Sequence, residues 1–193
     1  MVRDRKLVTS AGEHFVCSVL ARFGWAASLT REGLERTDIL AAHTESRRMI
    51  EVQVKAISAG SRPSWPLGKK GTIGAETERE WFVLVLLAPS PRDRPRAFIV
   101  PRDHVAAATW IGHLSWLTSP DVPAGKRNAG IDAARIGIND WLGYEERWDL
   151  LKGSAFEAPV LLPAWMKSMA NEPRVGLPQG HRWLGGTPEW SEA

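Results

Sequence analysis

Eight consecutive apolar residues, from Trp81 to Ala88, constrain the fold of this chain more than any other feature. A run of this length without a polar position is typical of a central β-strand that is covered on both faces. It is far shorter than the roughly 20 residues that a membrane-spanning helix needs. The run therefore predicts a sheet with packing layers on both sides, in a protein that does not cross a membrane.

The segments around this run follow helix and strand patterns. Apolar residues recur first at helical and then at strand spacing, which predicts a helix and three strands at residues 9–23, 25–29, 37–43 and 49–57. A polar turn separates the last two strands, so we expect an antiparallel hairpin. A further strand is expected at 97–100, followed by a helix that begins near His104. This order is typical of an α/β protein with a mixed sheet flanked by helices.

The periodicity is lost from about Ser119, where Pro, Gly and Trp become frequent. Six of the ten tryptophans lie at or beyond Trp116. We therefore divide the chain into an α/β core over 1–118 and an irregular Trp/Pro-rich C-terminal extension over 119–193, which packs on the core or on a partner. Tryptophan is mostly buried in folded proteins, which favours a core role over an aromatic platform for nucleic acid.

Positive charge is concentrated at the front of the chain. Residues 1–70 carry 12 Lys and Arg against 7 Asp and Glu, whereas residues 71–193 carry 13 against 15. This asymmetry is compatible with a polyanionic partner such as nucleic acid. The single cysteine, Cys17, cannot form an internal disulfide, and the N-terminal residues lack an apolar signal core. We therefore expect a cytoplasmic protein.

The strand at 50–57 carries the most informative side chains. Its strict alternation puts Glu51, Gln53 and Lys55 on one face and apolar residues on the other. One interpretation is an ordinary strand with one face in water. On an inner strand, however, polar groups are costly to bury unless water, metal or substrate meets them, and a cleft is then the simplest explanation.

Together with two other segments, this strand resembles a known family. Glu13 in the N-terminal helix, Asp38 in Thr-Asp-Ile-Leu and the Gln53-Val54-Lys55 tripeptide resemble the PD-(D/E)xK, restriction-endonuclease-like nucleases over about residues 9–105. The resemblance implies an αβββαβ core and metal-dependent hydrolysis of DNA. Gln53 departs from the Asp/Glu-x-Lys form and is similar to the Gln-x-Lys branch of Mrr-like and resolvase-like endonucleases. RNA as substrate and a homodimeric assembly are compatible with the same residues.

The chemistry of such a site can be argued from the residues. Phosphodiester hydrolysis needs a hard cation such as Mg²⁺, with Mn²⁺ as a substitute, and oxygen ligands to hold it. Asp38 supplies an anionic oxygen, while Gln53 and the Val54 backbone supply carbonyl oxygens. Glu13 reaches the cation through water, and Lys55 holds the attacking water or the transition-state phosphate. We therefore expect a Mg²⁺-dependent DNA endonuclease that uses a metal-activated water.

Each of these roles has a structural alternative. Glu13 can close a capping box with Ser10 at the start of the helix. Asp38 can be a turn residue, and Lys55 can pair with Glu51 or another acid. Glu51 is a secondary candidate, because it either replaces the missing acid or points beyond the metal.

The loop at 59–80 contains candidate nucleic-acid contacts. Lys69 and Lys70 either contact the DNA backbone or belong to a solvated turn. Trp65 either stacks on a base or covers the core. Two other functions remain open: a catalytically inactive nuclease-fold module that binds nucleic acid, and a protein-interaction domain in which the extension dominates.

Overall fold

A computed structural model describes residues 4–30, 36–60, 63–123 and 125–191. They form two compact units whose segments alternate along the chain. The first unit comprises Met1–Pro63, Glu76–Pro101 and Tyr144–Ala158, and the second comprises Ser64–Ala75, Arg102–Gly143 and Pro159–Ala193. The extension expected from residue 119 therefore contributes to both units.

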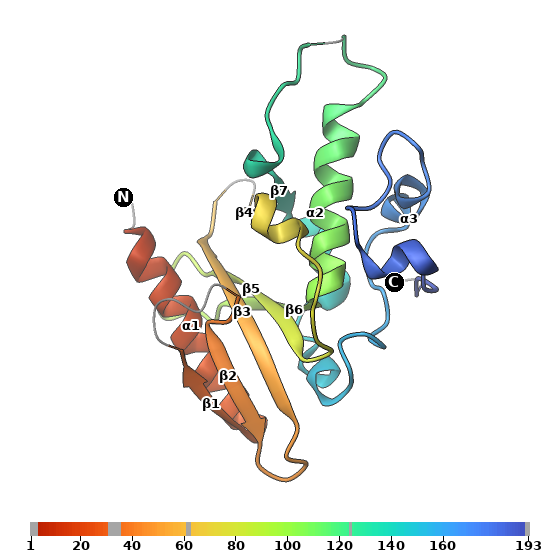
Figure 1. The fold of residues 1–193 in the computed structure, drawn as a ribbon. Helices are drawn as coiled ribbons and strands as arrows, with labels where there is room; N and C mark the ends of the chain where they lie inside the picture. The colour runs from red at the N-terminus through yellow and green to blue at the C-terminus, as the bar shows by residue number, and fades with distance from the viewer. Residues whose placement is uncertain (1–3, 31–35, 61–62, 124, 192–193) are drawn as a thin grey trace. The chain divides into compact units, whose positions relative to one another are not determined.

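The first unit is built on a five-stranded sheet (Figure 1). Its strands, in the spatial order β1-β2-β3-β5-β6, are β1 (Trp25–Leu29), β2 (Ile39–His43), β3 (Met49–Ser58), β5 (Glu80–Leu87) and β6 (Arg96–Pro101). β3 and β5 run parallel, and the other neighbours run antiparallel. The predicted antiparallel hairpin, which is β2 and β3, and the predicted α/β class with a mixed sheet are both confirmed.

The apolar run that dominates the sequence forms β5, which lies between β3 and β6. Each of the five residues from Trp81 to Val85 is at most 2% exposed. Fully burying a side chain of this size contributes about 1.5–3 kcal/mol. The hydrophobic effect therefore places this segment inside the sheet, as predicted.

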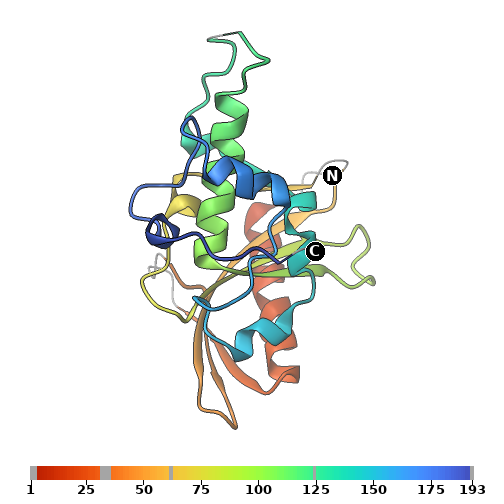
Figure 2. The same ribbon diagram turned by 90° about the vertical axis from the view of Figure 1, so that its right-hand side faces the viewer.

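α1 (Arg5–Arg22) lies along the strands of the first unit, as Figures 1 and 2 show. A Cβ atom built on Gly12 would lie 2.5 Å from the Ala56 Cβ, so the absence of a side chain at Gly12 permits this close approach. The same atom would lie 3.6 Å from Val54 Cγ1. α1 therefore covers the face of β3 that carries Val54 and Ala56.

The start of α1 differs from the prediction. The helix begins at Arg5, and the side chain of the N-cap residue Asp4 accepts a hydrogen bond from the Lys6 N–H. Ser10 and Glu13 lie well inside the helix, so the predicted start at residue 9 and the capping-box interpretation of Glu13 are both wrong. The apolar pattern locates the buried face of a helix, and the first turn of α1 is exposed.

The connection from β3 to β5 differs from the αβββαβ order that the resemblance implies. Its described residues form β4 (Ser64–Pro66) and the 3₁₀ helix η1 (Lys69–Thr72), where the resemblance implies an α-helix. Both elements belong to the second unit. α2 (Arg102–Leu117) follows β6, where a helix was expected near His104.

The second unit is assembled around α2. This helix contacts η1, α3 (Ala164–Ala170) and β7 (Arg135–Gly137), and β7 pairs antiparallel with β4. The remaining short helices of this unit are 3₁₀ helices, namely η2 (Ile131–Ala133), most of η3 (Ile138–Tyr144) and η5 (Arg182–Gly185). Across the described ranges, no helix combines the length and apolar character needed to cross a membrane.

The Trp-rich extension contributes to the core of both units. Trp148, on the 3₁₀ helix η4 (Trp148–Lys152), is buried and stacks on Phe23 in the first unit. Trp141 and Trp183 are buried in the second unit, although Trp116 and Trp165 remain exposed. Burial of these three tryptophans agrees with the core role that the sequence favours.

Candidate active site

Asp38 lies immediately before β2, where the ladder between β2 and β3 ends. Its backbone N–H donates to the Val52 carbonyl at 2.9 Å, and since Val52 is already the register partner of Ile39, the regular pairing ends here. Asp38 Oδ2 then accepts a 2.7 Å hydrogen bond from the Val54 N–H. The carboxylate is therefore held beside the middle residue of the Gln53-Val54-Lys55 tripeptide. This bond crosses to another strand, in contrast to the local bonds of a turn-forming aspartate.

Gln53 and Lys55 leave β3 on the face opposite to Val54 and Ala56, because side chains alternate along a strand. Gln53 is 8% exposed and Lys55 is half-buried. The antiparallel register of β2 and β3 ends at the Ile39–Val52 pair, and Asp38 lies immediately beyond it, bonded to Val52 and Val54. The structure therefore places Asp38 beside the Gln53-Val54-Lys55 segment of β3.

Glu13 approaches these residues from α1. It follows Gly12 in the sequence and is half-buried. Burial raises the pKa of Glu13, the negative charge of Asp38 raises it further, and the charges of His14 and Lys55 act in the opposite direction. Glu13 therefore lies within electrostatic range of both Asp38 and Lys55. α1, β3 and the start of β2 therefore each contribute a charged residue to this part of the first unit.

The donors at this site suit a hard cation. In the part of the chain that the structure describes, no three His, Cys, Asp or Glu side chains form a group that could hold a metal ion. The site offers instead the carboxylates of Asp38 and Glu13, the Gln53 amide oxygen and the Val54 carbonyl, which faces the same side as the Val54 N–H. Mg²⁺ is commonly held by one or two carboxylates, with waters and substrate phosphate as further ligands. A divalent cation would also relieve the repulsion between Glu13 and Asp38.

Glu51 has a structural partner at the start of β3. Its carboxylate forms a 3.4 Å ion pair with Arg79, and its backbone N–H donates to the Arg79 carbonyl at 2.9 Å. Both side chains are partly exposed, so this pair contributes about 0–1 kcal/mol to stability. Glu51 therefore stays a secondary candidate, two residues before Gln53.

The candidate nucleic-acid contacts lie in the second unit. Lys69 and Lys70 are exposed on η1, where they are accessible to a polyanion. Trp65, on β4, is 0% exposed and pairs with Ile136 of β7. Base stacking needs an exposed ring face, so the assignment of Trp65 to nucleic-acid binding is corrected to the other alternative, a core residue.

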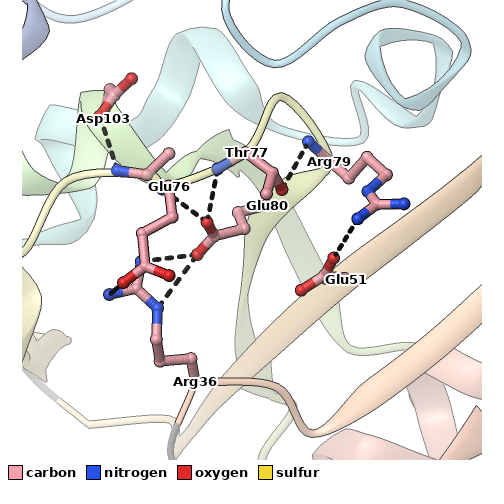
Figure 3. A network of polar contacts seen from close by, with 8 residues as sticks. Arg36, Glu51, Glu76, Thr77, Arg79, Glu80 and Asp103 are labelled. Carbon is pink, nitrogen blue, oxygen red and sulfur yellow. Dashed lines mark hydrogen bonds and ion pairs between the residues drawn. The ribbon is translucent and has the colours of Figure 1, made fainter.

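Two charged residues near the site were not predicted from the sequence. Glu80 is level with Glu51 in the parallel register of β3 and β5, so it lies on the face that carries Gln53. Figure 3 shows its carboxylate beside the guanidinium group of Arg36, which precedes Asp38 by two residues. One signal was available: Glu80 directly precedes the apolar run, and an acid at the end of a buried strand needs a partner.

The arrangement combines two carboxylates, two neutral oxygens and one ammonium group. Such a set can hold a divalent cation and offset negative charge on a phosphate. Comparisons of the chain with protein-family models, curated proteins and solved structures find no match. The residues themselves therefore carry the functional argument.

Proposed function

We propose that this protein is a metal-dependent DNA endonuclease that hydrolyses phosphodiester bonds and uses Mg²⁺ or Mn²⁺. The observation that carries the proposal is the 2.7 Å hydrogen bond between Asp38 Oδ2 and the Val54 N–H. It holds an acid against the tripeptide that contains Gln53 and Lys55. The resemblance to the restriction-endonuclease-like nucleases and the basic N-terminal part of the chain add support.

Each residue has a distinct task in the proposed reaction. Asp38, Gln53, the Val54 carbonyl and Glu13 would hold the cation. When bound, the cation supplies an activated water and offsets charge on the phosphate. The Lys55 ammonium group orients the attacking water or stabilises the charge that develops on the phosphate oxygens.

The proposed substrate is DNA, with RNA as the alternative. Phosphate contacts position a protein on nucleic acid without reading its sequence. The exposed Lys69 and Lys70 would make contacts of this kind. We also propose that the protein acts in the cytoplasm, and that two copies assemble if both strands of a duplex are cut together.

A plasmid-nicking assay tests the proposal. The wild type is expected to nick supercoiled DNA with Mg²⁺ or Mn²⁺, and EDTA is expected to abolish nicking. Asp38→Asn and Lys55→Met should each lower the rate by roughly 10²-fold or more, because they remove a cation ligand and a transition-state charge. Lys152→Met, at an exposed lysine of the same unit, is the matched control and should nick normally.

Circular dichroism spectra should show that both site variants remain folded. Normal nicking by folded Asp38→Asn and Lys55→Met proteins would show that the site is incorrect.

A catalytically inactive nuclease-fold module that binds nucleic acid is the second candidate. Gln53 favours it, because a neutral amide replaces an acid and lowers the negative charge available to a cation. This module would bind DNA with steep salt dependence, yet would not nick it with either metal. Binding of a protein partner that is insensitive to salt and survives Lys69→Glu and Lys70→Glu would instead support an interaction domain.

A further inference from the structure

The carboxylate of Glu80 is buried at the start of β5 and is satisfied by four donor groups. Glu80 is 3% exposed. Its Oε1 accepts hydrogen bonds from the backbone N–H groups of Glu76 at 2.7 Å and Thr77 at 2.9 Å. Its Oε2 accepts from Arg36 Nη2 at 2.7 Å and Nε at 3.3 Å (Figure 3). Charge-assisted bonds of this kind are roughly twice as strong as neutral ones.

The Arg36–Glu80 pair joins two parts of the sheet that lie on either side of β3. Arg36 precedes β2, whereas Glu80 begins β5, and β3 separates these two strands. Since Glu80 shares a face with Glu51 and Gln53, the pair spans the face of β3 that carries Gln53. Arg36 Nη1 also lies 3.1 Å from Glu76 Oε1, at the exposed edge of this contact.

Only Thr37 separates Arg36 from Asp38. On the other side of this segment, the Asp38 carbonyl accepts a 2.9 Å hydrogen bond from the Thr30 N–H, and the Thr37 carbonyl accepts one at 2.6 Å from Thr30 Oγ1. The Asp38 N–H is bonded to Val52, and Glu80 holds Arg36 at the start of this segment. An aspartate side chain is short, so the position of its carboxylate follows the position of its backbone closely.

We propose that Arg36 and Glu80 are positioning residues that hold the Asp38 carboxylate against Val54, between Gln53 and Lys55. The catalytic importance of this position rests on the proposed function. The hydrogen bond itself can be measured without any activity, so the two ideas can fail separately.

Hydrogen exchange of the Val54 amide, followed by NMR, tests the proposal. In Arg36→Met, which keeps much of the side-chain length but removes the charge, the Val54 amide should exchange about tenfold faster or more, because its acceptor is displaced. The amide of Val83, in the buried strand β5, reports opening of the whole unit and should change less.

Arg96→Met is the matched control. Arg96 forms a similar two-point contact, with Nε at 2.5 Å and Nη2 at 2.7 Å from the Glu145 carboxylate, on the edge strand β6. This variant should leave Val54 exchange unchanged. Glu80→Gln is the second variant, because its amide oxygen can still accept from Glu76 and Thr77 while the charge facing Arg36 is lost. If Arg36→Met does not fold, the exchange rate of the Val54 amide in Glu80→Gln tests the proposal.

The outcomes separate the two proposals. Selective loss of Val54 protection in Arg36→Met or Glu80→Gln supports positioning, even if the wild type does not nick DNA and the proposed function fails. Wild-type protection of Val54 in folded variants overturns positioning. If the wild type nicks DNA, positioning predicts a rate about 10²-fold lower in Arg36→Met and a higher Mg²⁺ requirement. Normal nicking by both variants together with wild-type protection of Val54 would overturn positioning and leave the proposed function intact.

Discussion

The contact between Gly12 of α1 and Ala56 of β3 gives a sharp test of how Glu13 is placed. In Gly12→Ala, the new methyl group would lie 2.5 Å from the Ala56 Cβ and 3.7 Å from its Cα. Ordinary carbon contacts lie at about 3.5–4.0 Å. Neither methyl group has a rotamer that would relieve the overlap, so the helix must move away from the strand.

The expected magnitudes follow from this geometry. Overpacking costs about 1–3 kcal/mol, and replacing glycine by alanine inside a helix returns about 1 kcal/mol. Gly12→Ala should therefore lower the free energy of unfolding by about 0–2 kcal/mol. Ala56→Gly loses a partly buried methyl group and puts glycine in a strand, which together cost about 1–2 kcal/mol. The double variant has no overlap, so it should be more stable than additivity predicts by about 1–3 kcal/mol.

Urea denaturation of the four proteins measures this double-mutant cycle. If Glu13 acts in catalysis, nicking should fall in Gly12→Ala and recover in the double variant, because the helix returns to its place on β3. A cycle that is additive within about 0.5 kcal/mol would refute the reasoning, since it would mean that the two methyl groups never compete for the same space.

Three further predictions concern single residues. Because burial and Asp38 raise the pKa of Glu13, the folded state holds this proton more tightly than the unfolded state, and that contribution to stability is lost as pH rises through the folded pKa. Glu13→Gln should therefore gain stability relative to the wild type as pH rises above the ordinary glutamate pKa of about 4.3 in urea denaturation, and a pH-independent difference would contradict this. Burial lowers the pKa of His104 to about 3, with a smaller effect of the His181 charge, so protonation of the unfolded state should destabilise the protein below about pH 6.5 by up to about 1.4 kcal/mol per pH unit. His104→Phe should flatten this dependence in thermal unfolding, and an unchanged slope would argue against it. Trp65→Ala should lower the free energy of unfolding by about 3–5 kcal/mol. Lys69→Ala should instead reduce the slope of log DNA affinity against log salt concentration by about 1. The reverse pattern would show that Trp65 contacts nucleic acid.

Several features of the fold could be predicted because they depend on local patterns. The apolar run from Trp81 predicted a strand that is covered on both faces, and β5 is such a strand. Alternation in 50–57 indicated which side chains share a face, and the polar turn before it indicated an antiparallel partner. The predicted strand therefore lies beside Asp38, which is hydrogen-bonded to Val54.

Other features could not be predicted, because they depend on which distant residues meet. Arg36 and Glu80 are 44 positions apart, and nothing in either local pattern specifies the other as its partner. No residue of the first turn of α1 is buried, so the buried apolar face did not mark the start at Arg5, which was missed. The burial of Trp65 depends on β7, a strand more than 60 residues away along the chain.

The amino-acid order alone determined the five strands of the first unit, the polar face of β3 and the acid that precedes β2, because periodicity and turn composition act over a few residues. Only the tertiary structure decided that Glu13 lies near Asp38, that Arg36 reaches Glu80, and that Trp65 belongs to a core. Such pairings are selected by packing and by the need to satisfy buried charge, which are properties of the whole folded unit.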